Sequence, residues 1–424
     1  MRGLFVTVVL GVFFLLLPMT TRQEARRRKG ELPPLIKERL PFVEGKGGSW
    51  RLPPSWLADL ATMPLPSNIT LNPSNIREAV SLAVFLSSGK PERHIPHTDI
   101  PLIVHQTWKT TKPETWPSNM LECVEAWLWA AEPPATNAHE WPNLRVKDSP
   151  WDWSDGVDTA FFLWDDDGME ETVTSLWPEG LEMYKTLPAN VMRADTFRVL
   201  VVRLFGGVYA DTDTKPLRRP SRWVSETDIT PWTDDVGQAH AGLGDNRIRL
   251  LVGIEADTPP DSDAYWRMGY GHPVELLQWA LAGAAGHPSL IEMVESIRLA
   301  AGEMAKEGTL AKADALQLTG PFRWTDVVQG YLAQEPGFEW NSLTGLKDGG
   351  RSKVVRDVLV LPVTGFSPGR SSVFGNMGSK PVSDPDARLL HQAQGTWKHT
   401  SAKVEVGKLC RTLLGLCRDW PTVA

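Results

Sequence analysis

Two aspartates separated by one residue, Asp211 and Asp213, end the stretch FGGVYADTD. The Asp-x-Asp spacing alone is uninformative, because the chain has 51 acidic residues and repeats this spacing at Asp165, Asp261 and Asp384. Here, however, a short apolar run leads into the pair. Residues two apart in a strand face the same side, so the two carboxylates would repel each other and raise each other's pKa. A divalent cation removes this repulsion, and oxygen ligands from few protein groups suit Mg²⁺ or Mn²⁺ that also binds a substrate's phosphates.

The segment 189–205, ANVMRADTFRVLVVRLF, places charged side chains directly before this pair. Its apolar residues recur at helical spacing, and Gly206 is a typical residue just after a helix. The predicted helix carries Arg193, Asp195 and Arg198, and the last two share one face because they are three residues apart. A surface ion pair is the competing interpretation. The helix leads straight into the two aspartates, however, which favours a functional role.

The neighbouring segments predict the elements that carry these residues. The sequence PLIVH gives a buried strand at residues 101–105, and TAFFLWDDD gives a second strand that runs into three carboxylates. From Gly207 the chain again has the pattern of a strand. Strands and helices that alternate with short connections predict an α/β fold with a mainly parallel sheet covered by helices, whose ligand site lies beyond the carboxyl ends of the strands.

The composition and the other motifs exclude several classes of protein. A net charge of −7 gives no electrostatic footprint for nucleic acid. The Walker A, dinucleotide G-x-G-x-x-G and H-E-x-x-H patterns do not occur in the sequence. The sequence GFSPG at residues 365–369 satisfies G-x-S-x-G, but Pro368 follows the serine and has no N–H to donate to an oxyanion hole. A serine hydrolase is therefore excluded at this position.

The amino-terminal region predicts attachment to a membrane. Residues 4–19 form an uncharged apolar run just under the length that spans a bilayer, and no small-x-small cleavage site follows it. We therefore expect an uncleaved signal-anchor over residues 1–20. The basic residues after this run oppose a lumenal catalytic domain under the positive-inside rule. The sequon at Asn68 favours a lumenal domain, because it is glycosylated only in the secretory lumen.

The rest of the chain divides by composition. We expect a Pro-rich, extended stem over residues 21–95, interrupted by one helix, then a catalytic domain over 96–400 and a tail over 401–424. The tail contains Cys410 and Cys417, which are close enough in sequence for a local disulfide that leaves Cys123 over. Three unpaired thiols are the alternative.

The stretch RADTFRVLVVRLFGGVYADTD resembles the signature of glycosyltransferase family 32, in which Ala-Asp, an arginine, two glycines, an aromatic residue and Asp-x-Asp follow in this order. Further segments resemble the family in family order: IPLIVHQTWKT, FLWDDD, VGIEAD, QWALAGAAGHPSL, LTGPFRWTD and HQAQGTWK. Together they cover about residues 96–400. The set is most similar to the initiation-specific α-1,6-mannosyltransferases of the fungal Golgi. The resemblance implies a nucleotide-sugar-binding fold of the GT-A type.

For function, the resemblance implies a single-pass type II protein of the Golgi membrane with a lumenal catalytic domain. It implies retaining transfer of mannose from GDP-mannose to an N-linked glycan core, in α-1,6 linkage, with Mn²⁺ as the cofactor. Carried over to this sequence, Asp211 and Asp213 would hold Mn²⁺ and, through it, the donor diphosphate. Asp195 and Arg198 would reach the donor sugar, and Trp108 would stack on the nucleobase.

The resemblance also suggests roles for five further residues. Asp165, Asp166 and Arg193 are candidates for donor binding, with solvated acids at a strand end as the alternative for the first two. Glu255 is the candidate for a polar group on the far face of the sugar, and an acid bound to a neighbour is its alternative. His391 is the candidate for a third metal ligand, because two aspartates leave an octahedral ion short of ligands. A structural histidine is the alternative there.

Two departures from the family pattern concern the acceptor. Phe322 stands where a small residue is expected, and Gln392 and Ala393 replace the usual histidine and aromatic residue. Both lie in segments expected to face the acceptor. Inositol phosphoceramide is therefore an alternative acceptor, which the single apolar segment weakly disfavours. A catalytically inactive sugar-binding protein is the alternative of another class, but the metal and sugar motifs are intact.

Overall fold

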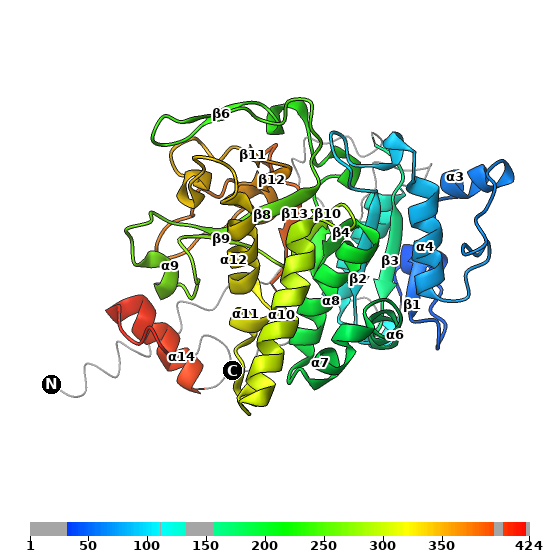
Figure 1. Ribbon diagram of the computed structural model, residues 1–424, viewed down its shortest axis with the longest axis horizontal. Helices are drawn as coiled ribbons and strands as arrows, with labels where there is room; N and C mark the ends of the chain where they lie inside the picture. The colour runs from blue at the N-terminus through cyan, green and yellow to red at the C-terminus, as the bar shows by residue number, and fades with distance from the viewer. Residues whose placement is uncertain (1–31, 111, 133–155, 394–401, 421–424) are drawn as a thin grey trace.

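The computed structural model describes residues 32–110, 112–132, 156–393 and 402–420 (Figure 1). No helix within these ranges is both long and apolar enough to cross a bilayer. The signal-anchor predicted for residues 1–20 lies outside the described residues.

The strands are β1 (Gly48–Arg51), β2 (Ile103–Thr107), β3 (Ala160–Trp164), β4 (Gly207–Ala210), β5 (Thr214–Pro216), β6 (Trp232–Thr233), β7 (Ala239–His240), β8 (Leu250–Asp257), β9 (Val274–Leu276), β10 (Ala280–Gly283), β11 (Lys353–Val355), β12 (Val358–Leu361) and β13 (Leu389–His391). The helices are α2 (Pro34–Arg39), α3 (Pro54–Leu57), α4 (Ile76–Ser87), α5 (Ser118–Ala131), α6 (Asp166–Leu176), α7 (Leu181–Thr186), α8 (Asn190–Phe205), α9 (Ala264–Arg267), α10 (Pro288–Lys306), α11 (Ala315–Leu318), α12 (Pro321–Leu332), α13 (Val363–Phe366) and α14 (Ala402–Leu409).

One large sheet organises the described part of the chain. Its nine strands follow the order β1-β3-β2-β4-β10-β8-β12-β11, with β9 paired to β8. Strands β3, β2, β4, β8 and β12 run in one direction, so their carboxyl ends lie at the same edge of the sheet. The other four strands run the opposite way. The α/β class is confirmed.

Five of the nine strands share one direction, in keeping with the mainly parallel sheet that the sequence predicted, and the antiparallel strands are the difference. The main difference is β10, which lies antiparallel between β4 and β8. After β8 the chain returns through residues 258–273, which contain only the short helix α9, and β9 and β10 follow. A parallel return needs a long crossover, usually a helix that packs on the sheet, and this connection provides none.

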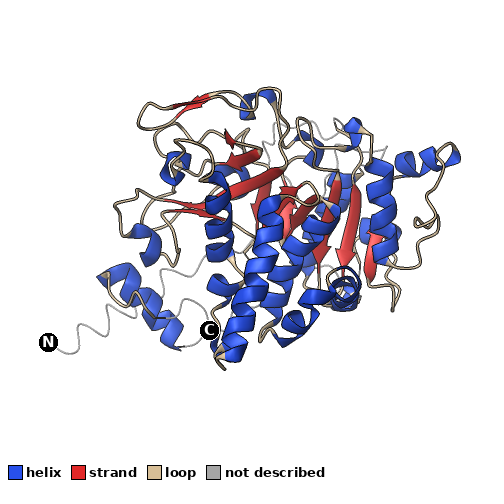
Figure 2. Cartoon of the chain, in the orientation of Figure 1, coloured by secondary structure: helices blue, strands red, loops and turns tan. Residues whose placement is uncertain are grey.

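Helices cover the sheet on both faces (Figure 2). Helices α4, α8, α10 and α12 lie in front of it in the view of Figure 1. Helix α8 confirms the predicted helix of residues 189–205: it ends at Gly206, whose φ of 70° suits glycine, and β4 begins at the next residue. On the other face, α5 packs against β5, which pairs with β13 in an antiparallel two-stranded ribbon.

Residues 32–95 pack on the sheet, where the sequence predicted an extended stem. Strand β1 pairs with β3 along its whole length, from Gly48 opposite Trp164 to Arg51 opposite Phe161. Helix α4, whose existence was predicted, begins after Asn75, which caps it by accepting from the backbone N–H of Glu78. The prolines suggested a linker, but the buried apolar residues between them belong to the same core as the sheet.

The carboxyl-terminal segment consists of a helix, a π-helical turn and a local disulfide. Helix α14 continues into a π-helical turn at Cys410–Leu414, and a disulfide joins Cys410 to Cys417. Cys123 is buried and free on α5. The local disulfide is therefore confirmed and the alternative of three unpaired thiols is wrong.

Candidate active site

The two aspartates of the opening motif follow β4 at the carboxyl edge of the sheet. Together with His391, Asp211 and Asp213 offer ligand atoms that all lie within 4.8 Å of one another. Within this group, His391 Nε2 lies 3.2 Å from Asp213 Oδ1. Three groups from two distant segments of the chain therefore converge on one point. We call this group the carboxylate cluster.

The β5–β13 ribbon brings His391 to the aspartates. Its register places His391 opposite Thr214, and the backbone N–H of Gln392 donates to the Asp213 carbonyl at 2.9 Å. The imidazole also stacks on Trp279 from the segment before β10, with ring centroids 4.3 Å apart. Burial acts to lower the pKa of His391, but the hydrogen bond and charge of Asp213 outweigh it and raise the pKa. The histidine is therefore fixed by backbone pairing, stacking and charge.

Helix α8 places the buried side chain of Arg198 between the carboxylates of Asp195 and Asp211. The guanidinium of Arg198 lies 3.2 Å from Asp195 Oδ1 and 3.1 Å from Asp211 Oδ1. Asp195 also accepts a hydrogen bond from the Thr319 hydroxyl at 2.9 Å. The predicted shared face of Asp195 and Arg198 is confirmed, and the pair is buried, so the interpretation as a surface ion pair is wrong.

One arginine for two carboxylates, buried Asp195 and partly buried Asp211, leaves excess negative charge. Burial raises the pKa of Asp195 to about 6, in spite of Arg198. Burial likewise raises the pKa of Asp211, and the charge of Asp213 acts in the same direction. The pKa of Arg198 is raised: burial acts to lower it, but the charges of Asp211 and Asp195 prevail. The carboxylate cluster therefore favours binding of a further cation.

Two residues that sequence reasoning missed hold Asp211 in place. Tyr209 donates its hydroxyl hydrogen to Asp211 Oδ1 at 2.9 Å, and Gln106 donates to the Asp211 carbonyl at 3.2 Å. Tyr209 lies in β4, two residues before Asp211, which directly follows the strand, so period-two alternation could have predicted that both face one side. Gln106 comes from β2, and its contact depends on strand order, which the local sequence does not encode.

Glu255, in β8, lies in the same region but is already paired. Arg370 donates to Glu255 Oε1 at 2.6 Å, and Trp279 donates to Oε2 at 3.0 Å. Burial acts to raise the pKa of Glu255, but the charge and hydrogen bond of Arg370 lower it. Glu255 is therefore an acid bound to its neighbours, and a role for it on the far face of the sugar stays a prediction. Arg370 and Tyr270, which contact each other, were missed by sequence reasoning.

The remaining candidates lie at the ends of β2 and β3. Trp108 follows β2 and packs edge-on against Trp116, with centroids 5.8 Å apart. Asp165 is buried and caps α6 by accepting from the Gly168 backbone N–H at 2.8 Å, which is a structural role. Asp166 is exposed in the first turn of α6, and the positive charge of Arg193 acts on its carboxyl group.

Arg193 is also bound within the protein. It donates to the Leu187 carbonyl at 3.1 Å and contacts Asn190 at the start of α8. Asp166 and Arg193 are therefore neighbours that come from different elements, whereas Asp165 is held by its own helix. Binding of a donor by any of these side chains stays a prediction.

The carboxylate cluster fits a divalent metal ion by its donor set. Two carboxylates and one imidazole are ligands that Mn²⁺ and related cations accept, and oxygen donors from a substrate's phosphates complete such a site. Asp211 is shared with Arg198 and Tyr209, whereas Asp213 pairs with His391. Asp211, Asp213 and His391 would hold the ion.

The region that contains α8 and the aspartates matches known proteins. Residues 150–230 match the family model of the glycosyltransferase sugar-binding region containing DXD motif. An initiation-specific alpha-1,6-mannosyltransferase of Schizosaccharomyces pombe is 36% identical over 220 residues, which cover 51% of this chain and 49% of that protein. The same enzyme of Candida albicans is 31% identical over 249 residues, which cover 54% of this chain and 59% of that protein.

A more distant relative has a different acceptor in its name. Inositol phosphoceramide mannosyltransferase 3 of Schizosaccharomyces pombe is 29% identical over 135 residues, which cover 30% of each protein.

The chain spans about half the length of the two initiation-specific mannosyltransferases that it matches. These matches confirm the resemblance that the motifs predicted, to glycosyltransferases with an Asp-x-Asp motif and to the initiation-specific mannosyltransferases.

Proposed function

We propose that this chain is a metal-dependent glycosyltransferase of the GT-A type that moves mannose from GDP-mannose to an N-linked glycan core in α-1,6 linkage. The observation that carries the proposal is the carboxylate cluster at the carboxyl edge of the sheet, within and beside the matched region. Relatives named as mannosyltransferases support mannose as the sugar. The excess negative charge of the cluster supports a bound cation. We assign this cation as Mn²⁺, because Mn²⁺ accepts an imidazole ligand more readily than Mg²⁺ does.

Each side chain of the cluster has a role in this reaction. When bound, the cation offsets the negative charge that builds on the leaving diphosphate. Arg198 keeps Asp211 aimed at the cluster, and Asp195 holds Arg198 in place from the other side. Contact of Asp195 with the donor sugar stays part of the proposal. His391 and Asp213 complete the ligand set.

Retention of the anomeric configuration allows two routes. Either a group on the far face of the sugar acts as the nucleophile, or the leaving group departs and the acceptor attacks on the same face. Glu255 is our candidate for the far-face group. Because Arg370 keeps its pKa low, Glu255 is ionised at neutral pH and could stabilise positive charge that develops on the sugar.

A direct assay tests donor, acceptor and stereochemistry together. The full chain is incubated with Mn²⁺, a series of sugar nucleotides, and either a mannose-rich N-glycan or inositol phosphoceramide. Mass spectrometry and NMR then identify the product and its linkage. We expect transfer only from GDP-mannose and onto the N-glycan, with no product from the Asp211→Asn variant. Transfer to inositol phosphoceramide alone would replace the acceptor, and no transfer of mannose by the intact chain would reject the proposal.

For localisation, we propose a single-pass type II protein of the Golgi membrane with its catalytic domain in the lumen. The exposed side chain of Asn68, on the loop before α4, is accessible to glycosylation. Digestion with an N-glycosidase should change the mobility of the intact chain and leave that of the Asn68→Gln variant unchanged. If neither changes and a protease added outside sealed microsomes degrades the domain, the proposed orientation is wrong.

A further inference from the structure

Trp279, in the short segment between β9 and β10, contacts the backbone of a candidate metal ligand. Strand β10 pairs antiparallel with β4, with Ala280 opposite Ala210. The pairing continues for one more residue, because the backbone N–H of Asp211 donates to the Trp279 carbonyl at 2.8 Å. A change of the Trp279 side chain retains this backbone bond. The effects of such a change therefore report on the indole ring.

The Trp279 side chain contacts two further candidate site residues. Its ring stacks on the imidazole of His391, with centroids 4.3 Å apart and an angle of 26° between the two planes. Its indole Nε1–H donates to Glu255 Oε2 at 3.0 Å. The residue is only 9% exposed. One buried side chain therefore joins the candidate metal ligand on β13 to the carboxylate on β8.

Both contacts restrict the orientation of the group that they touch. The indole plane covers one face of His391, which limits rotation of the imidazole and keeps its Nε2 in the carboxylate cluster. Glu255 is held through both oxygens, since Arg370 donates to Oε1 at 2.6 Å and Trp279 donates to Oε2. The Ser367 hydroxyl, 3.4 Å from Oε2, adds a longer bond. Loss of the indole N–H would leave Oε2 with that longer bond.

Another tryptophan makes the same kinds of contact outside the carboxylate cluster. Trp232, in β6, stacks on His240 with centroids 3.8 Å apart, and its indole N–H donates to the Val354 carbonyl at 3.0 Å. Both tryptophans are buried. They differ in the acceptor, which is a backbone carbonyl for Trp232 and the Glu255 carboxylate for Trp279. Trp232 therefore provides a matched control for Trp279.

We propose that Trp279 is a positioning residue, which fixes the orientation of His391 in the ligand set and of Glu255 toward the donor sugar. The inference rests on the proposed function, because the roles of both groups in transfer belong to it. The groups that hold the diphosphate and the carboxylate that faces the sugar must keep one separation, and a displacement of about 1 Å can reduce the rate about 100-fold. The indole is a rigid ring system that touches both sides, so it sets this separation.

Two substitutions separate the two contacts. Trp279→Phe retains an aromatic face for His391 but removes the N–H donor to Glu255, whereas Trp279→Leu removes both contacts. Binding of Mn²⁺ to the full chain, without sugar nucleotide, is measured by EPR of the free ion. We expect Trp279→Phe to bind Mn²⁺ as the wild type does. Trp279→Leu should bind it about 10-fold more weakly, as for other residues that orient a metal ligand.

Transfer kinetics test the contact with Glu255. Trp279→Phe should lower kcat about 10-fold and leave the KM for GDP-mannose unchanged, because a misplaced carboxylate weakens the transition state and not the binding of the donor. In the Glu255→Gln background, Trp279→Phe should cause no further fall in kcat, since the charge that it positions is already absent. Equal falls in the two backgrounds would show a role in folding alone and contradict the proposal.

The control is Trp232→Phe, the same chemical change outside the carboxylate cluster, which should leave kcat and Mn²⁺ binding unchanged. Urea unfolding checks that each variant is folded, and if Trp279→Leu is not, the kcat of Trp279→Phe decides. Wild-type kcat in Trp279→Phe, or wild-type Mn²⁺ binding in Trp279→Leu, would overturn the proposal. A wild-type chain that bound no Mn²⁺ would overturn it together with the metal assignment. If the wild type binds Mn²⁺ but transfers no mannose, the proposed function fails, and the Mn²⁺ titrations still decide whether Trp279 positions His391.

Discussion

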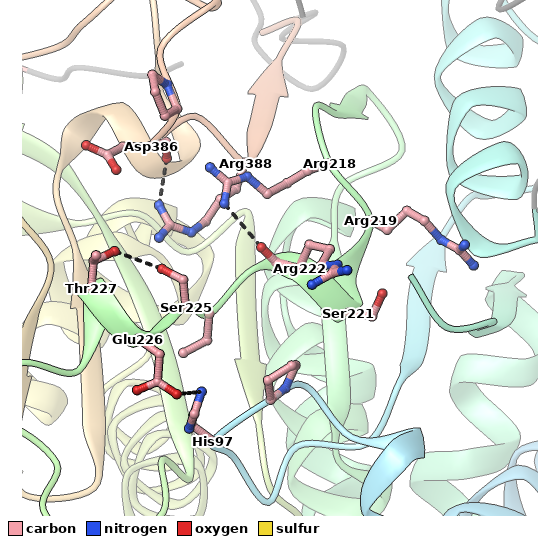
Figure 3. Close-up of a pocket in the computed structure, with 13 residues that line it drawn as sticks. His97, Arg218, Arg219, Ser221, Arg222, Ser225, Glu226, Thr227, Asp386 and Arg388 are labelled. Carbon is pink, nitrogen blue, oxygen red and sulfur yellow. Dashed lines mark hydrogen bonds and ion pairs between the residues drawn. The ribbon is translucent and has the colours of Figure 1, made fainter. Parts of the chain in front are cut away.

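The two ends of the β5–β13 ribbon carry charges of opposite sign. At one end Asp211 and Asp213 meet His391. At the other end Arg218 follows β5 and Arg388 precedes β13, and both line a cavity that Figure 3 shows. Both ends join the same two strands, which come from distant parts of the chain. One pair of strands therefore separates a group of carboxylates at one end from a group of arginines at the other.

The two ends also differ in how their charges are balanced. At the carboxylate end, one arginine pairs with two aspartates, the buried Asp195 and the partly buried Asp211, so negative charge is in excess. At the arginine end, Arg388 pairs with the carboxylate of Asp228 and donates to two carbonyls, whereas Arg218 donates to the carbonyls of Ala387 and Arg222. Substitutions at one end should therefore change function at that end and leave the other unaffected.

Substitution of Asp213 should have the largest effect on transfer. Asp213→Asn keeps the shape but removes a ligand charge, so we expect kcat/KM to fall at least about 100-fold, because an ion that stabilises the leaving diphosphate contributes several kcal/mol. Steady-state kinetics measure this. The control is Asp261→Asn, the same change at an exposed Asp-x-Asp pattern, which should keep full activity. Near-normal transfer by Asp213→Asn in excess donor would refute the metal assignment.

Substitution of His391 should change the metal requirement. His391→Ala removes the nitrogen ligand but leaves both aspartates, so we expect the Mn²⁺ concentration for half-maximal activity to rise by about 10- to 100-fold. The matched control is His272→Ala, whose ring pairs with Asp326 outside the carboxylate cluster. Titration of Mn²⁺ against activity separates the two variants. An unchanged requirement in His391→Ala would remove this residue from the ligand set.

Substitution of Arg370 should shift the pH profile. Arg370 lowers the pKa of Glu255 against the effect of burial, so its loss lets burial raise that pKa. In Arg370→Gln, Glu255 would then become protonated at a higher pH, and the acid limb of kcat/KM should move to higher pH. Profiles of the wild type, this variant and the control Arg351→Gln, whose side chain hydrogen-bonds to Thr230 and Pro231, test it. Coincident acid limbs would show that the charge of Glu255 is not needed.

Substitution of Asp228 should change stability but not transfer. Its pKa is lowered: burial acts to raise it, but Arg388 and the hydroxyls of Ser352 and Ser225 prevail. Such a group adds stability above its unfolded-state pKa of about 3.9, and this is lost as the pH falls through the folded-state value.

We expect Asp228→Asn to lower the free energy of unfolding by about 3 kcal/mol at neutral pH, because it leaves Arg388 buried without its carboxylate. Urea unfolding at several pH values should show that the difference from the wild type shrinks below about pH 4. A variant of normal stability that lost transfer would contradict the independence of the two ends.

Local patterns predicted the carboxylate end well and the arginine end not at all. Helical spacing placed Asp195 and Arg198 on one face, and the strand after Gly207 placed the aspartates at the sheet edge. The family resemblance predicted that His391 would join the two aspartates as a third metal ligand. By contrast, Arg218 and Arg388 are far apart in sequence and meet only through strand pairing, which no local period encodes. The contact between Arg370 and Glu255 could not be predicted for the same reason, because the two residues are far apart in sequence.

Strand β1 has a practical consequence for producing the protein. It covers the outer side of β3, a strand of five apolar residues that are all buried. A shortened chain that began at residue 96 would leave the backbone N–H and C=O groups along that side of β3 unpaired. Exposed apolar edges of this kind recruit further strands from neighbouring molecules and aggregate. A shortened version of the domain should therefore keep residues 32–95, so that β1 can close this edge of the sheet.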